Sequence, residues 1–313
     1  MLLPAGILVF QFLSCSFCRL LTLQTSFVGF HLFADNIHKQ DSARAIAFLD
    51  NKLIVLSSCD SRLHVYDATN SYASCGSINV PVLKFVDMVV CHFNHCIYMV
   101  DAGRSEGRQP SSSVIRFKLG SHYKKTMDGN IDSSTVISVM RSHDLLVVCS
   151  SANALKIFDA HLIPLKCVPL QSDIVSLTCA VELTPGRYVL THGKDTDALH
   201  RVCVVNSEGK LLHTYGCLKG SYPGLLDSPE DVFVDKNGFV YVDNGSTKCL
   251  IVLSPTLEFI HRISAPLGTN LNLNNGRPQL RFSMDKESGY LYVRPKYLIE
   301  YDSSPRPVYT YHL

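Results

Sequence analysis

The strongest constraint on the fold of this chain is a set of short apolar segments that occur in pairs along most of its length. Within each segment, apolar and polar residues alternate and β-branched or aromatic residues are frequent, which is typical of β-strands. The six pairs are residues 52–57 with 63–66, 96–100 with 114–117, 145–150 with 155–158, 187–191 with 202–205, 239–243 with 250–253, and 290–293 with 298–301.

A third apolar run precedes each pair, and a more polar fourth run follows, as at residues 211–215 and 259–263. Four strands per unit and a period of ~43–52 residues predict a β-propeller or a related array. Six such units fill residues 41–313. One four-stranded sheet cannot bury both of its faces alone, so neighbouring units must pack on one another. The preceding runs are residues 45–49, 88–93, 136–140, 178–183, 232–234 and 280–284.

The second strand of most pairs is followed by a residue that favours turns. Aspartate, asparagine and serine do so because their side chains accept hydrogen bonds from the backbone two residues further on. We therefore expect hairpins stabilised by side chains at Asp67, Asp159, Asn206, Ser254 and Asp302.

The fifth unit has the most explicit pattern, SPEDVFVDKNGFVYVD at residues 228–243, followed by NGSTKCLIVLSPTLEFI. This pattern resembles the NHL repeat, which has a proline, an apolar strand ending in Asp, a glycine turn, a Tyr-Val-Asp strand and an Ile-x-Val-Phe strand. The sixth unit keeps Asp285 and the turn at Gly289 but has Arg294 where the family has Asp. The resemblance implies an all-β fold, a six-bladed β-propeller of four-stranded antiparallel blades, in residues 36–313.

Residues 1–35 form a separate apolar N-terminal segment. Residues 1–18 carry no charge and resemble the apolar region of a secretory signal, although the positive residues that precede such a region are missing. The segment is a signal, an anchor, or an ill-defined start with one strand at residues 20–30, and no stable membrane span is expected. Either residues 20–30 or residues 307–313 would supply the strand that closes the last blade.

The placement of the twelve cysteines favours a reduced, cytoplasmic protein. Several lie singly in or beside apolar runs and are expected to behave as small buried hydrophobes. A chain with a large core does not need a disulfide framework. A signal function of residues 1–19 would instead make the protein secreted or membrane-anchored. The cysteines concerned are Cys59, Cys149, Cys179, Cys203 and Cys249.

The densest cluster of metal-type ligands is CHFNHC at residues 91–96. Two cysteines and two histidines are able to complete a tetrahedral zinc site. Adjacent residues of a strand point to opposite faces, however, so one short hairpin does not aim all four side chains at one point. We expect two buried thiols, Cys91 and Cys96, below an exposed hairpin tip, with no metal and no cofactor.

The sequence contains no hydrolase, P-loop, metalloprotease or dinucleotide motif, so we expect no catalytic residues. Some propellers similar to NHL proteins are lyases that hold a metal with histidines from several blades. His192, His200 and His261 fall on different predicted strands. A secreted, metal-dependent lyase therefore stays an alternative.

The loops that join second to third strands, and one blade to the next, are longer than the other hairpins and are the expected binding rim. They contain eight basic and eight acidic residues, whereas RNA binding requires a basic face with stacking aromatics. We therefore expect a monomeric, non-catalytic module that binds a protein or peptide, as in the propellers of tripartite-motif ubiquitin ligases, with an RNA-binding NHL propeller as the alternative. The expected binding residues are Arg104, Arg108, Lys124, Lys125, Lys219, Tyr222, Lys248 and Arg277.

Overall fold

The computed structural model describes strands and turns, and no helix is present among the residues that it describes. It follows that no helix in the described part of the chain is long and apolar enough to cross a membrane. The described residues are 7–12, 25–31, 43–57, 62–67, 69–70, 73–80, 85–103, 112–118, 124–128, 135–149, 153–194, 196–220, 222–245, 249–264, 280–285, 290–295 and 309–312.

The chain divides into two compact units. We call Val82–Gln279 the four-sheet unit, and the combination of Met1–Pro81 with Leu280–Leu313 the terminal unit. Each sheet formed by the described residues takes all of its strands from one unit.

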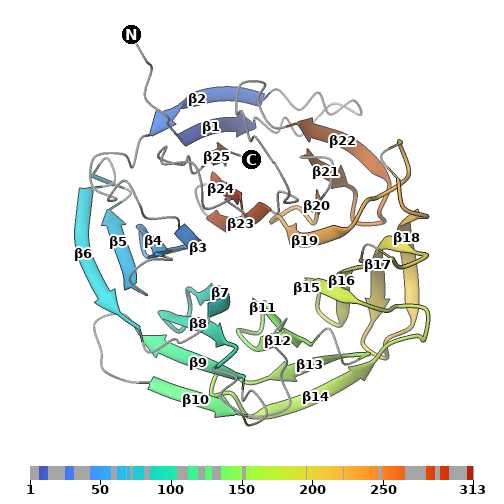
Figure 1. Cartoon of the computed structure of the whole chain (residues 1–313), viewed down its shortest axis with the longest axis horizontal. Coiled ribbons are helices and arrows are strands. Elements are labelled where there is room, and N and C mark those ends of the chain that lie inside the picture. The colour runs from blue at the N-terminus through green and yellow to red at the C-terminus, as the bar shows by residue number, and fades with distance from the viewer. Residues whose placement is uncertain are drawn as a thin grey trace. The chain divides into compact units, whose positions relative to one another are not determined.

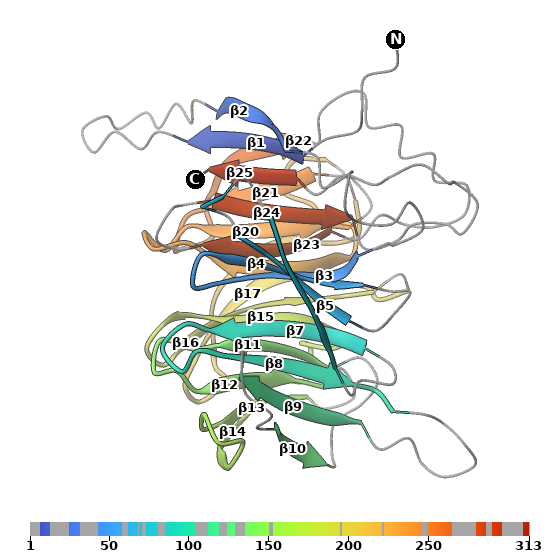
Figure 2. The same cartoon turned by 90° about the vertical axis from the view of Figure 1, so that its left-hand side faces the viewer.

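The four-sheet unit consists of four antiparallel sheets, each made of four consecutive strands (Figure 1). Figure 2 shows the first sheet from the side, with its strands in chain order. The sheets are β7 (Phe85–Cys91), β8 (Cys96–Asp101), β9 (Ser113–Lys118) and β10 (Lys124–Asp128); β11 (Val136–Val139), β12 (Leu145–Val148), β13 (Ala154–Phe158) and β14 (Pro164–Pro169); β15 (Leu177–Thr184), β16 (Arg187–His192), β17 (His200–Asn206) and β18 (Leu211–Cys217); and β19 (Pro229–Val234), β20 (Val240–Asn244), β21 (Cys249–Leu253) and β22 (Phe259–Ser264).

Apolar side chains fill the space between neighbouring sheets of this unit. The innermost strands pack in sequence, β7 with β11, β11 with β15, and β15 with β19. Between the first two sheets, the fully buried Tyr98 and Val147 belong to one apolar cluster. The hydroxyl of Tyr98 donates a hydrogen bond to the carbonyl of Ala160, in the turn between β13 and β14, over 3.0 Å. Each sheet therefore buries on its neighbour the face that it is unable to bury alone.

Polar side chains also join neighbouring innermost strands. A carboxylate oxygen of Asp87 on β7 accepts a hydrogen bond from the backbone N–H of Ile137 on β11, over 2.9 Å. The hydroxyl of Ser138 donates to the carbonyl of Ala180 on β15, over 2.8 Å. These bonds satisfy backbone groups that would otherwise be buried without a partner, and they fix the register between sheets.

The terminal unit contains one four-stranded antiparallel sheet and one five-stranded mixed sheet. In the five-stranded sheet the order is β2-β1-β25-β24-β23, and β1 runs parallel to β25. The strands of the first sheet are β3 (Ala43–Leu49), β4 (Lys52–Ser57), β5 (Arg62–Asp67) and β6 (Ala73–Asn79). Those of the second are β1 (Ile7–Phe12), β2 (Thr25–His31), β23 (Leu280–Asp285), β24 (Tyr290–Pro295) and β25 (Tyr309–His312).

The expected number of blades is wrong. Among the described residues, five four-stranded antiparallel blades are present instead of six, because the last sheet has five strands and one parallel pair. Its third strand is β25, whereas the expected strand at residues 298–301 lies outside the described residues. Two segments, residues 20–30 and 307–313, were the alternatives for the strand that closes this sheet. Both contribute a strand to it, as β2 and β25. The apolar residues of β1 lie between them.

The expected hairpins are confirmed wherever the structure describes them. Asp159, Asn206 and Ser254 each accept hydrogen bonds from the backbone N–H groups two and four residues further on, over 2.7–3.2 Å. Asp67 accepts one from the N–H two residues on, over 2.9 Å. Asp302 lies outside the described residues.

Candidate functional site

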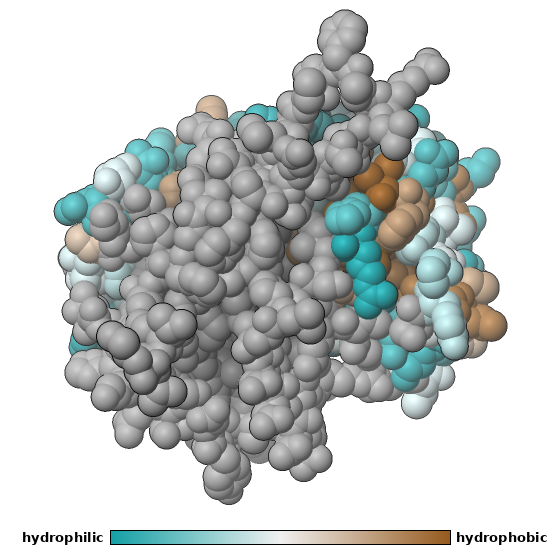
Figure 3. Space-filling model, turned by 90° about the horizontal axis from the view of Figure 1, so that it is seen from above, coloured by the Kyte–Doolittle hydropathy of each residue, from teal (hydrophilic) through white to brown (hydrophobic). Residues whose placement is uncertain are grey.

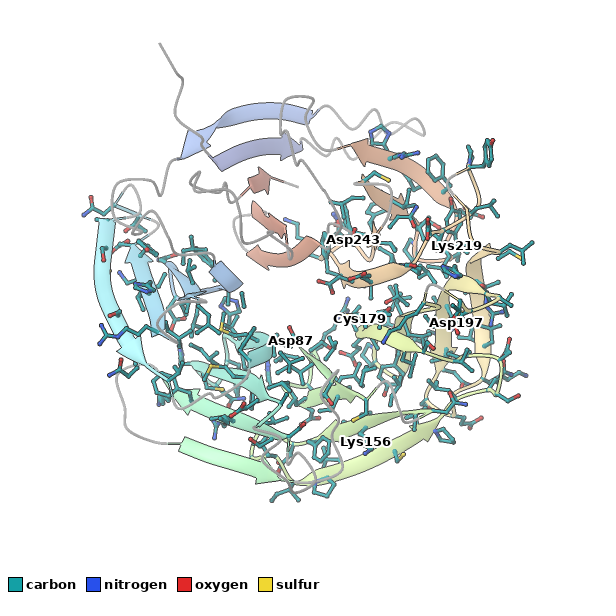
Figure 4. All side chains as sticks on the ribbon, viewed as in Figure 1. Asp87, Lys156, Cys179, Asp197, Lys219 and Asp243 are labelled. Atoms are coloured by element: carbon teal, nitrogen blue, oxygen red, sulfur yellow. The ribbon has the colours of Figure 1, made fainter. Side chains whose placement is uncertain are left out.

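The described rim loops of the four-sheet unit lie where β16 joins β17 and where β18 joins β19. The turn that leads into β15 reaches the same end, because the carbonyl of Ser176 accepts a hydrogen bond from the N–H of Gly193 over 3.3 Å. We call the described residues of these segments, 170–176, 193–194, 196–199, 218–220 and 222–228, the rim face. Figure 4 labels Asp197 and Lys219, which lie in two of these loops, and Asp243, which belongs to β20 of the next sheet.

The loop at residues 218–228 is held in one shape by its own contacts. The N–H of Gly220 donates to the carbonyl of Leu226 over 2.9 Å, and Leu226 is fully buried. Lys219 forms an ion pair with Asp227 over 3.6 Å. At the tip, the N–H of Leu225 donates to the carbonyl of Tyr222 over 2.9 Å. Pro223 and Gly224, which has a φ of 86°, occupy the two central positions of this turn, as a type II turn requires.

This ordered loop presents apolar side chains to solvent. Tyr222 is 77% exposed and Leu218 is 59% exposed. Val175, in the turn before β15, is 44% exposed on the same rim face. Exposed apolar residues that are held in place on a loop are typical of a recognition surface.

Two buried polar side chains tie the rim loops to the strands. His200 accepts a hydrogen bond on Nδ1 from the N–H of Ser228 over 2.8 Å, and its Nε2 lies 3.2 Å from the carbonyl of Asp197. The side-chain oxygen of Asn244 accepts from the N–H of Asp227 over 2.6 Å. Since both ring nitrogens of His200 are engaged with the backbone, this histidine positions the loops and is not free to ligate a metal.

A second histidine is held neutral by its surroundings. Nε2 of the buried His192 accepts a hydrogen bond from Nε of Arg201 over 3.0 Å. Burial, followed by the charge of Arg201, lowers the pKa of His192 to about 4. Arg201 also donates to the carboxylate of Asp173 over 2.7 Å, and this hydrogen bond lowers the pKa of Asp173. The histidine therefore accepts from a fixed cation at neutral pH and does not serve as a metal ligand through Nε2.

The three histidines considered for a lyase-type metal centre do not come together. His192 and His200 each bind different neighbours, and His261 is exposed on the outermost strand β22. Among the residues that the structure describes, no group of three or more His, Cys, Asp or Glu side chains is arranged to hold a metal.

Two of the eight expected binding residues, Lys219 and Tyr222, lie together on the 218–228 loop. Lys124 and Lys125 were expected on a rim loop, and this expectation is wrong, because they begin the outermost strand β10. Such a strand pairs along one edge only, so its sequence has little apolar alternation and resembles a loop. The other four lie outside the described residues: Arg104, Arg108, Lys248 and Arg277.

Sequence reasoning did not single out Leu218, Val175 or the Arg201–Asp173 pair. The signal for Leu218 was an apolar residue in the same loop as the Pro223-Gly224 turn, five residues before Pro223. No comparable signal exists for Arg201 and Asp173, because they come from separate strands and turns and meet only in the fold.

Gly193 at the base of the rim face is expected not to tolerate a side chain. Its φ is 102°, and an added Cβ would lie 2.2 Å from the carbonyl oxygen of Leu199. We expect Gly193→Ala to lower the free energy of unfolding by about 1–3 kcal/mol and to displace the 193–199 loop. Urea denaturation measures the effect. Gly224→Ala is the matched control, because its φ is also positive but no atom lies within 4 Å of the added Cβ. Equal losses in both variants would contradict the steric argument.

No protein-family model and no curated protein sequence matches this chain. Solved structures with β-propeller folds do match it. The chain has the fold of a β-propeller.

The matching structures are distant in sequence. A structure of hydrazine synthase from Kuenenia stuttgartiensis matches with a TM-score of 0.54 and 16% identity, over 83% of this chain and 76% of that chain. A nidogen/laminin complex matches with a TM-score of 0.55 and 10% identity, over 72% and 81%. A streptogramin B lyase matches with a TM-score of 0.53 and 12% identity, over 83% and 93%. Because these proteins differ in function, their likeness is one of fold alone.

Proposed function

We propose that this chain is a non-catalytic, NHL-like β-propeller module that binds a protein or peptide through the rim face. The observation that carries the proposal is the exposure of Tyr222 and Leu218 on a loop held by internal hydrogen bonds. A loop ordered before binding loses little conformational entropy when a partner docks. Tyrosine is also frequent among the residues that contribute most to protein interfaces. The substrate-recognition part of a ubiquitin-ligase-type system is one setting that such a module fits.

The charges on the rim face favour a protein partner over RNA. The described lysines are Lys194 and Lys219, and Lys219 is already paired with Asp227. Asp173 and Asp197 lie on the same face, so the described part of the rim carries no basic excess. In Figure 3, which views the molecule from above Figure 1, hydrophobic and hydrophilic residues lie side by side wherever the surface is coloured. A rim face without basic excess suits a polypeptide, whereas phosphate contacts require concentrated positive charge.

The test is binding by the wild-type chain and by Leu218→Glu and Tyr222→Ala. A partner is captured from cell extract, purified and titrated by calorimetry. We expect each substitution to weaken its binding by about 30-fold, because a central interface residue contributes about 2 kcal/mol. Ile163→Glu is the matched control, since Ile163 is 53% exposed in the turn between β13 and β14 and lies outside the rim face.

Unchanged affinity in both rim variants would exclude this loop as the binding site. Loss of binding in Ile163→Glu alone would show that the partner binds outside the rim face. Salt-sensitive binding of single-stranded RNA that is abolished by Tyr222→Ala would favour the RNA-binding alternative instead.

A further inference from the structure

The hairpin between β7 and β8 brings two cysteines face to face. Cys91 ends β7, Cys96 begins β8, and the register pairs them directly across the sheet. Directly opposed residues of antiparallel strands have Cα atoms about 4.5–5.5 Å apart, within the range that a disulfide spans. Both cysteines are free thiols and are buried. The pair is therefore placed for a disulfide that requires no change of register.

Polar neighbours distinguish the two sulfur atoms. Nε of Arg116, on the adjacent strand β9, donates to Sγ of Cys96 over 3.5 Å. The side-chain amide of Asn94 donates to Sγ of Cys91 over 3.2 Å. The Cys91 thiol, with Arg116 as a further donor, lowers the pKa of Cys96, whereas the interaction with Cys96 and burial raise that of Cys91. These opposite shifts of pKa make Cys96 the cysteine of the pair that loses its proton first and Cys91 the one that stays a thiol.

The turn that separates the two cysteines is the exposed part of the hairpin. Phe93 at its tip is 69% exposed, and its ring stacks on the ring of His143 with centroids 4.1 Å apart. His143 lies in the turn between β11 and β12, so this stack joins two neighbouring hairpins. Because both cysteines are buried, a small oxidant would need this tip to move away from His143 in order to reach the sulfur atoms.

We propose that Cys91 and Cys96 form a peroxide-sensitive dithiol that closes reversibly to a disulfide. The Cys96 thiolate attacks one oxygen of hydrogen peroxide, so an S–O bond forms and the O–O bond breaks. The hydroxide that leaves takes up the proton that the Cys96 thiol released, which gives the Cys96 sulfenic acid and one water. The Cys91 thiol then attacks the sulfenic sulfur, which forms the S–S bond and releases a second water. In sum, two thiols are oxidised and one peroxide is reduced to two waters.

The chain offers a direct readout of this reaction. Trypsin cleaves after Lys84 and Arg104, so one peptide, residues 85–104, contains both cysteines and no other. The folded full-length chain is treated with hydrogen peroxide, unfolded, alkylated and digested. We expect this peptide to lose two hydrogens and to escape alkylation, and dithiothreitol to restore both thiols. In Cys91→Ala, where no second thiol lies opposite Cys96 in the hairpin, dimedone should label Cys96.

Three variants test the assigned roles. Cys96→Ala should abolish the modification at this hairpin. Phe93→Ala should speed disulfide formation by about two- to tenfold, since it removes one stacked ring pair. Cys149→Ala is the matched control and should leave the rate unchanged, because Cys149 is buried in the same apolar cluster but is not opposite another cysteine. Circular dichroism of each variant establishes that it is folded.

Two outcomes would overturn the proposal. One is full alkylation of Cys91 and Cys96 after unfolding, at a peroxide dose that oxidises the exposed Cys75, Cys167 and Cys217. The other is a disulfide in peptide 85–104 that forms only when the chain is treated in denaturant.

Discussion

Acidification from pH 7 to pH 5 is expected to destabilise the four-sheet unit through His192. Burial, followed by the charge of Arg201, holds the folded-state pKa near 4, against 6.5 for the free side chain. The unfolded chain therefore takes up a proton first as the pH falls, and stability is lost between about pH 6.5 and pH 4. The shift corresponds to about 2 kcal/mol at pH 5 and about 3 kcal/mol below pH 4.

The measurement is urea denaturation at a series of pH values, compared with His192→Gln. Glutamine does not titrate and keeps an acceptor for the Nε–H of Arg201. We expect the wild-type and variant curves to diverge as the pH falls below 6.5. The control is His161→Gln, the same substitution at an exposed histidine. Parallel curves for the wild type and His192→Gln would rule out the assigned role.

Replacing Tyr98 by alanine is expected to have the largest effect on stability of any substitution considered. Its ring is fully buried in the apolar cluster that joins the first two sheets of the four-sheet unit. Truncation removes the packing contacts and leaves a cavity, so we expect a loss of about 3–5 kcal/mol. The hydroxyl alone contributes less. Tyr98→Phe leaves the carbonyl of Ala160 without this donor and should cost about 1 kcal/mol.

Chemical denaturation of both variants separates packing from hydrogen bonding. Tyr222→Ala is the control for tyrosine removal as such, because an exposed side chain should change stability by no more than about 0.5 kcal/mol. A cost below 1 kcal/mol for Tyr98→Ala would mean that the contact between these sheets contributes little to stability.

The second and third strands of the sheets were predictable from the sequence, because most of their residues are buried. β4 coincides with the predicted segment at residues 52–57, and β12 is shorter than its prediction by two residues. The outermost strands were harder to locate. β6 (ASCGSIN) is exposed at nearly every position, so no alternation of apolar and polar residues marks it. The alternation of apolar and polar residues that marks a strand in a sequence is weak in a strand that is mostly exposed.

The five-stranded mixed sheet was not predictable, because its central pairing joins opposite ends of the sequence. The parallel contact between β1 and β25 brings together residues such as Val9 and Thr310. No turn or spacing rule connects strands that are so far apart in the chain. At the rim face, Tyr222 was predictable as an aromatic residue in a long loop. The environment of His192 was not, since Arg201 and Asp173 reach it only through the fold.

The pairing of β1 with β25 has a consequence for biosynthesis. In the four-sheet unit every sheet is built from strands adjacent in sequence, so each sheet can form soon after its strands leave the ribosome. The mixed sheet must wait, because β25 is synthesised some three hundred residues after β1. Until then the apolar strand β1 has no β25 beside it, and a nascent chain halted before residue 309 would hold that edge open to chaperones.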